Sequence, residues 1–319
     1  MIPSAAQVDE ARTLLSRHLQ PTRLVRAPSL ERHGGGEVYL KLECDLPTGS
    51  FKPRGALYAL HRTVSDTGAS HVVAASTGNH GAAVAYAARL LGVPATIFLP
   101  ENANRVKRDR IASLGAHIVE RGADISAAIA GATAFAGEGG TYFLHDAADP
   151  HVPAGTATIA GEILDVLPRP DAILVPMGDT ALIRGVAAES KRRHLSVRVV
   201  GVAAERAPAY ARSWREGHAV ATETCDTIAD GLAVRQPLEG NVEDIRRLVD
   251  DVHLVSEDHM LEAIRALVFD EHIVAEPAGA AATAAFLGNA GAYAGATIVI
   301  LVTGSNVAPD VLRRALATA

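Results

Sequence analysis

Ile298-Val299-Ile300-Leu301-Val302 is an uninterrupted apolar run in a chain of 319 residues. A strand with one face in water alternates polar and apolar residues, whereas a strand of a parallel sheet is buried on both faces and is apolar throughout. This stretch therefore predicts a central strand of a parallel sheet. Similar β-rich runs predict strands at residues 37–43, 72–76, 95–99, 117–120, 172–177, 198–203, 253–255 and 297–302.

Helix-like stretches lie between these runs. Residues 79–91 and 104–114 are each followed by a glycine, which commonly ends a helix. Residues 257–269 follow Ser256, a good N-cap residue. The repeated strand–helix order predicts an α/β protein with mainly parallel sheets and helices on both faces.

Composition excludes several classes of protein. Apolar residues make up 48% of the chain and the formal net charge is −6, with no Lys/Arg patch between aromatic residues, so nucleic acid is not an expected partner. No apolar run approaches the length of a membrane span, and no signal pattern opens the chain, so we expect a cytoplasmic protein without a membrane partner. Cys44 and Cys225 lie far apart, which indicates neither a disulfide framework nor a zinc site.

The stretch Ala74-Ala75-Ser76-Thr77-Gly78-Asn79-His80-Gly81 joins a predicted strand to a predicted helix. Ligands bind parallel sheets where loops leave the carboxyl ends of strands, and the free N–H groups of a helix N-terminus attract anions. The stretch therefore predicts an anion site. The alternative interpretation is a capping turn, in which Ser76 or Thr77 caps the helix.

A second motif is Thr48-Gly49-Ser50-Phe51-Lys52-Pro53-Arg54-Gly55-Ala56. We predict that Ser50 is the N-cap of a helix and that Lys52 lies in its first turn, where the helix dipole disfavours a cation. A lysine whose ammonium form is disfavoured is a candidate nucleophile or Schiff-base former. The alternative is a solvated surface lysine, and local sequence alone favours that interpretation.

Taken together, the motifs resemble the serine/threonine dehydratase and serine racemase family, whose members depend on pyridoxal phosphate and share the fold of the tryptophan synthase β-subunit. The stretches that carry the resemblance run in order along nearly the whole chain. They are Lys41-Leu42-Glu43, Ser50 to Ala56, Ala75 to Gly81, Asp149-Pro150, Thr227-Ile228-Ala229-Asp230-Gly231, Glu276-Pro277-Ala278-Gly279-Ala280 and Thr303-Gly304-Ser305-Asn306-Val307.

The resemblance implies which residues bind the cofactor. Lys52 is expected to hold pyridoxal phosphate as an internal aldimine and to act as the catalytic base, with Phe51 beside it. Asn79 is expected to hydrogen-bond the 3′-oxygen, Thr303 to face the pyridine nitrogen, and Glu276 to lie near the ring. The phosphate is expected on a loop made of Gly178, Asp179, Thr180, Ala181 and Leu182.

The resemblance also implies a substrate site and a two-domain organisation. The substrate carboxylate is expected on Ser76, Thr77, Gly78, Asn79 and His80. Residues 1–47 and 144–319 are expected to form a large cofactor-binding domain, and residues 48–143 a small mobile domain that closes over the substrate. A homodimer is expected.

The phosphate loop departs from the family pattern of four consecutive glycines, because only Gly178 remains. A carboxylate aimed at a phosphate is repelled by about 4 kcal/mol per charge pair at about 4 Å and an effective dielectric constant of about 20. With the cofactor bound, we therefore expect Asp179 to point away and to cap the helix that starts near Ala181, while Thr180 donates a hydroxyl hydrogen bond. The alternative is a weak or lost affinity for the phosphate.

Two further departures concern metal binding and racemisation. Glu205 matches a metal-binding glutamate of relatives with racemase activity, but Ala211 stands where an aspartate is usual, and one carboxylate is a poor site for a hard cation. We therefore expect no metal. Thr77 stands where racemases place a serine that acts as an acid/base, so it is a second candidate catalytic residue, or else only a group that caps the turn or binds the carboxylate.

The predicted function is a pyridoxal-phosphate-dependent β-elimination of water from a small β-hydroxy amino acid, with L-threonine or L-serine as substrate and a 2-oxo acid and ammonia as products. An amino-acid racemase on the same scaffold is the first alternative. A β-replacement synthase and a non-catalytic ligand-binding α/β protein are the others.

Overall fold

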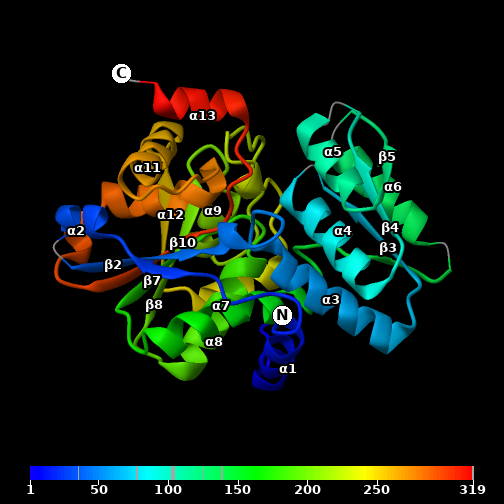
Figure 1. Cartoon of the computed structure of the whole chain (residues 1–319), viewed down its shortest axis with the longest axis horizontal. Helices are drawn as coiled ribbons and strands as arrows, with labels where there is room; N and C mark the ends of the chain where they lie inside the picture. Colours follow the sequence, from blue (N-terminus) through cyan, green and yellow to red (C-terminus); the bar gives the residue numbers. More distant parts are fainter. Residues whose placement is uncertain (35, 77, 102–104, 124, 138, 318–319) are drawn as a thin grey trace.

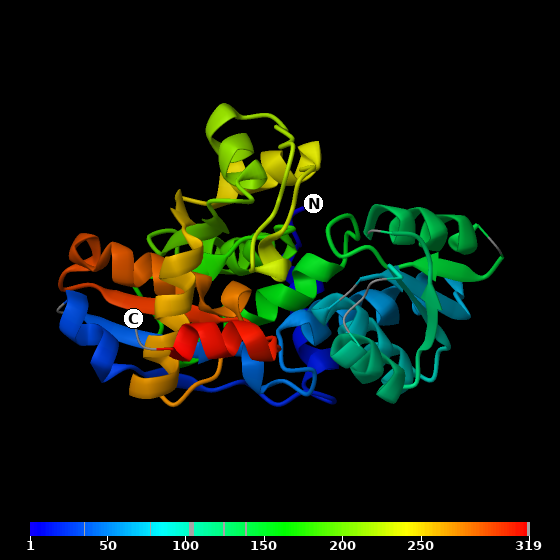
Figure 2. The same cartoon turned by 90° about the horizontal axis from the view of Figure 1, so that it is seen from above.

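The computed structural model describes residues 1–34, 36–76, 78–101, 105–123, 125–137 and 139–317. Two sheets form the centres of two bodies that lie side by side, which we call the large lobe and the small lobe (Figure 1). The same division is seen from above (Figure 2).

The large lobe is built on a six-stranded sheet with the order β1-β2-β10-β7-β8-β9. All neighbouring strands are parallel except β1 and β2, which are antiparallel. The strands are β1 (Leu24–Arg26), β2 (Glu37–Leu42), β7 (Ala172–Pro176), β8 (Arg198–Ala204), β9 (Asp251–Val255) and β10 (Thr297–Val302).

Both faces of β10 are buried, as its apolar run predicts. Ile298, Ile300 and Val302 belong to one core cluster, which also contains the inner side of α12. Val299 and Leu301 belong to a second cluster on the opposite face, together with residues of α7 and α8. Alternate side chains of a strand point to opposite faces, so an apolar residue is needed at every position.

The small lobe is built on a four-stranded parallel sheet with the order β5-β4-β3-β6. Val72 and Ala74 face the cluster that contains α3 and α4, whereas Val73 packs with α6 on the other side. The strands are β3 (His71–Ala75), β4 (Ala95–Leu99), β5 (His117–Glu120) and β6 (Thr141–Phe143).

The helices cover the faces of the two sheets and connect the lobes. The α-helices are α1 (Ala5–Leu15), α2 (Pro28–Gly34), α3 (Lys52–Thr67), α4 (Asn79–Leu91), α5 (Arg105–Ser113), α6 (Ile125–Ala136), α7 (Val152–Val166), α8 (Ala181–Arg193), α9 (Ala209–Glu216), α10 (Glu239–Leu248), α11 (Glu257–Asp270), α12 (Pro277–Gly288) and α13 (Pro309–Leu316). Short 3₁₀ helices are η1 (Glu43–Asp45), η2 (Asp230–Leu232) and η3 (Ala290–Tyr293). Among the described residues, none of the helices has the length and apolar character that crossing a bilayer requires.

The predicted α/β class and all eight predicted strands are confirmed, with their ends within two residues of the prediction. The sequence did not reveal β1 and β6, because three residues are too few for a periodic pattern. Gly92 ends α4 with φ 68°, and Ser256 caps α11 by accepting a hydrogen bond from the His259 N–H. The first residue of the predicted helix 104–114 lies outside the described residues. The division at residues 47/48 and 143/144 stays a prediction.

The helices α3 and α7 cross very closely at Gly155. A Cβ atom at this position would lie 2.2 Å from the carbonyl oxygen of Arg54, which is a backbone atom of α3 and cannot move alone. Overpacking of this kind typically costs about 1–3 kcal/mol. The glycine is therefore required by the approach of the two helices.

Gly155→Ala is expected to lower the free energy of unfolding by about 1–3 kcal/mol. Gly161→Ala is the matched control in the same helix, because a Cβ atom there meets only the Arg12 side chain at 3.7 Å. That control is expected to be neutral or to stabilise by about 0.5–1 kcal/mol, the usual gain of alanine over glycine in a helix. Urea unfolding of both variants checks the difference, and equal effects would contradict the close crossing.

Candidate active site

Lys52 is the first residue of α3 and lies between two carboxylates. Its Nζ donates to Asp179 Oδ2 at 2.6 Å and to Asp146 Oδ2 at 3.1 Å, and the Phe51 ring centroid lies 5.2 Å away. Burial disfavours the charged amine, but the two carboxylates outweigh burial, so the pKa of Lys52 lies above its ordinary value. The ammonium form of Lys52 is therefore favoured.

Two predictions about this motif are wrong. The Lys52 ammonium is not destabilised, because its carboxylate partners lie 94 and 127 residues later in the sequence and local sequence cannot reveal them. Ser50 is not the N-cap of α3, since Phe51 occupies that position without a side-chain capping bond. Ser50 instead pairs with Gly304 in an isolated bridge, and its buried hydroxyl has no hydrogen-bond partner among the described residues.

Asp146 is a site residue that the sequence did not indicate. It follows β6, a strand of three residues that is too short to show a periodic pattern, so its place near a strand end cannot be inferred from the sequence. Its Oδ2 also lies 4.0 Å from His80 Nδ1, and its Oδ1 lies 3.7 Å from His145 Nδ1. Burial raises the pKa of Asp146, but Lys52 and His80 outweigh burial and lower this pKa far below its ordinary value.

The phosphate loop, residues 178–182, leads from β7 into α8. A Cβ atom on Gly178 would lie 2.1 Å from the Gly231 carbonyl oxygen, which explains why this one glycine is retained. The prediction that Asp179 points away and caps α8 with the cofactor bound stays a prediction. In this structure Thr180 holds the N-cap position, and Asp179 Oδ1 accepts from the Ala181 N–H at 2.9 Å. Its Oδ2 does not point away from the site, because the ammonium group of Lys52 attracts it. Ala181 and Leu182 are buried at the start of α8.

Thr180 has an unusual backbone and an unusual side chain. Its φ is 72°, a left-handed conformation that favours glycine. Its side chain is buried, and the hydroxyl has no hydrogen-bond partner among the described residues. Buried hydroxyls normally find a partner, so Thr180 is one of the few exceptions within the described residues.

The loop of residues 76–80 connects β3 to α4. Thr77 lies outside the described residues, so its predicted catalytic role stays a prediction. Ser76 Oγ accepts from the Gly78 N–H at 3.3 Å, and Gly78 occupies the N-cap position without a side-chain capping bond. Ser76 therefore closes the turn but does not cap the helix. His80 is buried, and its Nε2 contacts the Leu144 carbonyl oxygen at 2.9 Å.

A chain of hydrogen bonds connects the lobes near Asn79. The Asn79 Nδ2 donates to Glu276 Oε1 at 2.6 Å, and Asn306 Nδ2 donates to Asn79 Oδ1 at 2.6 Å. Arg110 of α5 donates in turn to Asn306 Oδ1. The two residues predicted to flank the cofactor ring, Asn79 and Glu276, are thus in direct contact.

Thr303 follows β10 and is buried. Its carbonyl oxygen accepts from the Phe51 N–H at 3.0 Å, and its hydroxyl lies 3.5 Å from the Ala278 carbonyl oxygen. The Glu276 N–H donates to the carbonyl oxygen of the next residue, Gly304. These contacts bring together the predicted site residues Phe51, Lys52, Asn79, Asp179, Glu276 and Thr303.

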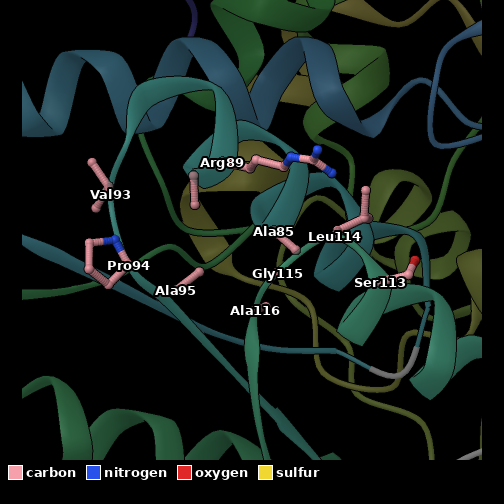
Figure 3. A pocket seen from close by; sticks show the side chains of 10 residues that line it. Ala85, Arg89, Val93, Pro94, Ala95, Ser113, Leu114, Gly115 and Ala116 are labelled. Carbon is pink, nitrogen blue, oxygen red and sulfur yellow. The ribbon is translucent and has the colours of Figure 1, made fainter.

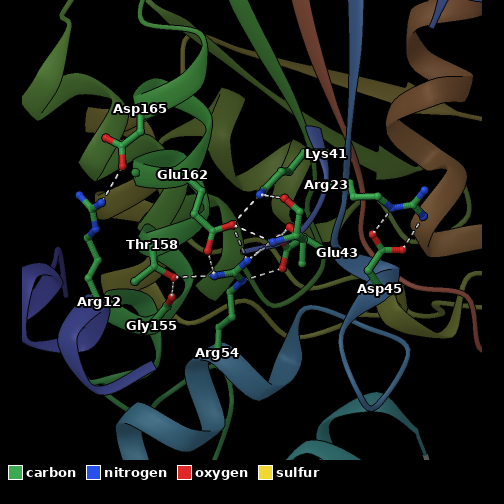
Figure 4. Close-up of polar contacts among 12 residues, drawn as sticks. Arg12, Arg23, Lys41, Glu43, Asp45, Arg54, Gly155, Thr158, Glu162 and Asp165 are labelled. Carbon is green, nitrogen blue, oxygen red and sulfur yellow. Dashed lines mark hydrogen bonds and ion pairs between the residues drawn. The ribbon is translucent and has the colours of Figure 1, made fainter. Parts of the chain in front are cut away.

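Arg54, two residues after Lys52, lies in a buried ion-pair network (Figure 4). Its guanidinium donates to both oxygens of Glu43 at 2.7 and 2.9 Å and to both oxygens of Glu162 at 2.6 and 2.8 Å. Lys41 Nζ donates to Glu162 at 2.5 Å, and the Thr22 hydroxyl donates to Glu43 at 2.7 Å. The network fixes the first turn of α3 to η1 and α7 of the large lobe.

A shallow pocket of about 400 Å³ lies elsewhere on the small lobe, between α4 and α5 (Figure 3). Its walls are mainly alanine and other apolar side chains, with Arg89 and Ser113 as polar members. None of its lining residues contacts Lys52, and the pocket is separate from the candidate active site.

The residues considered for a metal do not form a cluster. Glu205 is exposed after β8, and Ala211 is buried in α9. No group of three or more His, Cys, Asp or Glu side chains suited to a metal occurs within the part of the chain that the structure describes. The expected absence of a metal stays a prediction.

Comparison with known proteins gives consistent results. A family model described as "Pyridoxal-phosphate dependent enzyme" matches residues 15–304. L-threonine ammonia-lyase of Thermotoga maritima is 36% identical over 96% of this chain and 76% of its own length. Catabolic L-threonine dehydratase of Staphylococcus aureus is 34% identical over 96% of this chain and 90% of its own length. Among solved structures, maize serine racemase has a TM-score of 0.92 at 29% identity and covers 99% of this chain and 97% of its own.

Proposed function

The chain belongs to the pyridoxal-phosphate dependent enzymes, and from this premise we propose that it is an ammonia-lyase acting on a small β-hydroxy amino acid. L-threonine and L-serine are the expected substrates, and a 2-oxo acid and ammonia are the expected products. The observation that carries the proposal is the ion pair between Lys52 and Asp179, which places the Lys52 amine beside residues 178–182, the loop expected to receive the phosphate.

The residues present fit pyridoxal phosphate. Lys52 supplies a primary amine, Thr180 supplies a buried hydroxyl, and the N-terminus of α8 supplies backbone N–H groups, which favour an anion. Gly178 lets the loop approach Gly231 closely. We propose that residues 178–182 hold the phosphate, that Asn79 hydrogen-bonds the 3′-oxygen, that Glu276 lies near the ring and that Thr303 faces the pyridine nitrogen.

The bound cofactor supplies an electron sink for the charge left when the α-carbon loses its proton. Lys52 would hold the cofactor, and its amine, when free, would remove the α-proton of the substrate as a general base. The backbone N–H groups of residues 76–80 bind and orient the substrate carboxylate. The neutral Thr303 leaves the pyridine nitrogen less protonated than a carboxylate would, which favours loss of the β-hydroxyl over return of the proton.

An amino-acid racemase is the second candidate, and the similarity to maize serine racemase supports it. Thr77 would then act as the acid on the face of the substrate opposite Lys52. A racemase returns the proton to the α-carbon and keeps the β-hydroxyl, so the two activities yield different products from the same amino acid.

A screen of L- and D-β-hydroxy amino acids with the purified chain tests the proposal. Release of 2-oxo acid and ammonia in equal amounts is expected from L-threonine or L-serine, and the recovered substrate is expected to keep its chirality. Inversion without oxo acid would favour the racemase. No product from any member of the panel, by a protein that carries the cofactor, would rule out both activities.

We also propose that the enzyme works in the cytoplasm as a homodimer, as the family resemblance implies. Sedimentation velocity on the purified chain distinguishes a dimer from a monomer.

A further inference from the structure

Asp179 occupies one group that a phosphate would use and also contacts the amine that would hold the cofactor. Its Oδ1 accepts from the Ala181 N–H at the start of α8, and its Oδ2 accepts from Lys52 Nζ. We propose that Asp179 competes with the cofactor phosphate for the phosphate loop, and that this side chain sets how tightly the chain holds pyridoxal phosphate. The inference rests on the proposed function, because it assumes that residues 178–182 receive the phosphate.

The residue after Asp179 in the loop, Thr180, has a hydroxyl that the aspartate does not engage. Thr180 keeps a left-handed backbone, and its buried hydroxyl has no hydrogen-bond partner among the described residues. Asp179 is in the same loop but its two oxygens already use the Ala181 N–H and Lys52. A ligand with further acceptor oxygens would satisfy the Thr180 hydroxyl, which the aspartate does not do.

The phosphate and the Asp179 carboxylate are both negatively charged, so they repel each other when both lie in the loop. A phosphate monoester carries a charge of about −1.5 to −2 at pH 7, and Asp179 adds another negative charge in the same loop. The groups around Lys52 are Asp179, Asp146 and, on the far side of Asp146, His80 and His145. When the phosphate binds, Asp179 must give up the Ala181 N–H or remain beside a like charge.

Asp179 and Asp146 both accept a hydrogen bond from the Lys52 ammonium group, but only Asp179 lies on the loop of residues 178–182. Attachment of the cofactor joins the Lys52 nitrogen to the aldehyde carbon and releases water, so the ammonium group must first lose a proton to solvent. Both carboxylates favour the ammonium and therefore oppose attachment of any aldehyde. Only Asp179 also opposes the phosphate, so Asp146 provides a matched control.

The experiment compares the wild type, Asp179→Asn and Asp146→Asn as full-length chains. The bound cofactor is removed by dialysis against hydroxylamine, and pyridoxal phosphate or pyridoxal, which has no phosphate, is then titrated back. The visible absorption of the attached aldehyde gives the Kd of each probe. Asparagine keeps the Oδ1 acceptor for the Ala181 N–H, and thermal melting monitored by circular dichroism checks that each variant folds.

Asp179→Asn is expected to lower the Kd for pyridoxal phosphate, relative to the Kd for pyridoxal, by about tenfold or more. The reason is that one like charge is removed next to the phosphate. Asp146→Asn is expected to change the Kd values of both probes by the same factor. Inorganic phosphate is expected to compete with pyridoxal phosphate more strongly in Asp179→Asn than in the wild type.

Two results would overturn the inference while leaving the proposed function intact. One is an unchanged or weaker preference for pyridoxal phosphate over pyridoxal in Asp179→Asn. The other is an equal gain for both probes, which would show that Asp179 acts through Lys52 alone. If no variant, the wild type included, shows a visible band with either probe, the proposed function fails and the inference fails with it.

Discussion

Lys52→Ala is expected to abolish covalent attachment of pyridoxal phosphate and to lower turnover by about 10⁴-fold or more. The effect is large because one nitrogen has two roles, holding the cofactor and removing the α-proton. In the wild type, borohydride reduction followed by mass spectrometry is expected to locate the reduced cofactor on Lys52. In the variant, any bound cofactor should be released by denaturation.

Lys52→Arg is the control for this experiment. Alanine leaves the carboxylates of Asp146 and Asp179 without the cation that lies 3.1 and 2.6 Å from them, and their mutual repulsion could disturb the site. Arginine keeps a positive charge but does not form the attachment. Both variants are therefore expected to be inactive, and only Lys52→Ala is expected to lose stability at neutral pH. A reduced adduct on another lysine, or activity in Lys52→Arg, would refute the assignment.

Arg54→Met is expected to lower the free energy of unfolding by about 3–5 kcal/mol, the usual cost of removing one partner of a buried ion pair. The variant leaves Glu43 and Glu162 facing one another, and Lys41 is then the remaining cation that contacts Glu162 in the described network. Arg12→Met is the control, because its pair with Asp165 is exposed at 42% on both sides and is expected to contribute about 0–1 kcal/mol. Figure 4 shows both pairs.

Urea unfolding at several pH values measures the difference in the free energy of unfolding between the wild type and Arg54→Met and shows how this difference changes with pH. Burial raises the pKa of Glu162, but Arg54 and Lys41 outweigh burial and lower this pKa below its ordinary value. A lowered pKa gives stability that is present above the unfolded-state pKa of about 4.3 and is lost as the pH falls through the folded-state pKa. The difference between the wild type and Arg54→Met is therefore expected to shrink below about pH 4.3. A difference that is small at neutral pH, or that grows in acid, would contradict this account.

Residues with a local or periodic signal could be predicted from the sequence. The run that forms β10 needed no information from elsewhere, because burial on both faces leaves an apolar residue at each position. The start of α11 at Ser256 and the end of α4 at Gly92 could also be predicted, because each depends on the chemistry of one residue at the helix end.

The environment of Lys52 could not be predicted in the same way. Its charge state depends on Asp146 and Asp179, which the topology of two sheets brings to it from distant parts of the chain. Asp146 follows β6, and a strand of three residues has too few positions to show a period. Ser50 has good N-cap chemistry, but its pairing with Gly304 places it in extended backbone before the helix begins.

The network around Arg54 determines to which lobe Lys52 is attached. Helix α3 packs against α4 of the small lobe and against α7 of the large lobe. Its first turn is fixed to η1 and α7 by Glu43 and Glu162. Lys52, two residues earlier, is thus anchored to the large lobe. Any rotation of the small sheet carries the start of α4 toward or away from a stationary amine. If residues 76–80 bind the substrate as proposed, the separation between this loop and Lys52 would set how the substrate meets the amine.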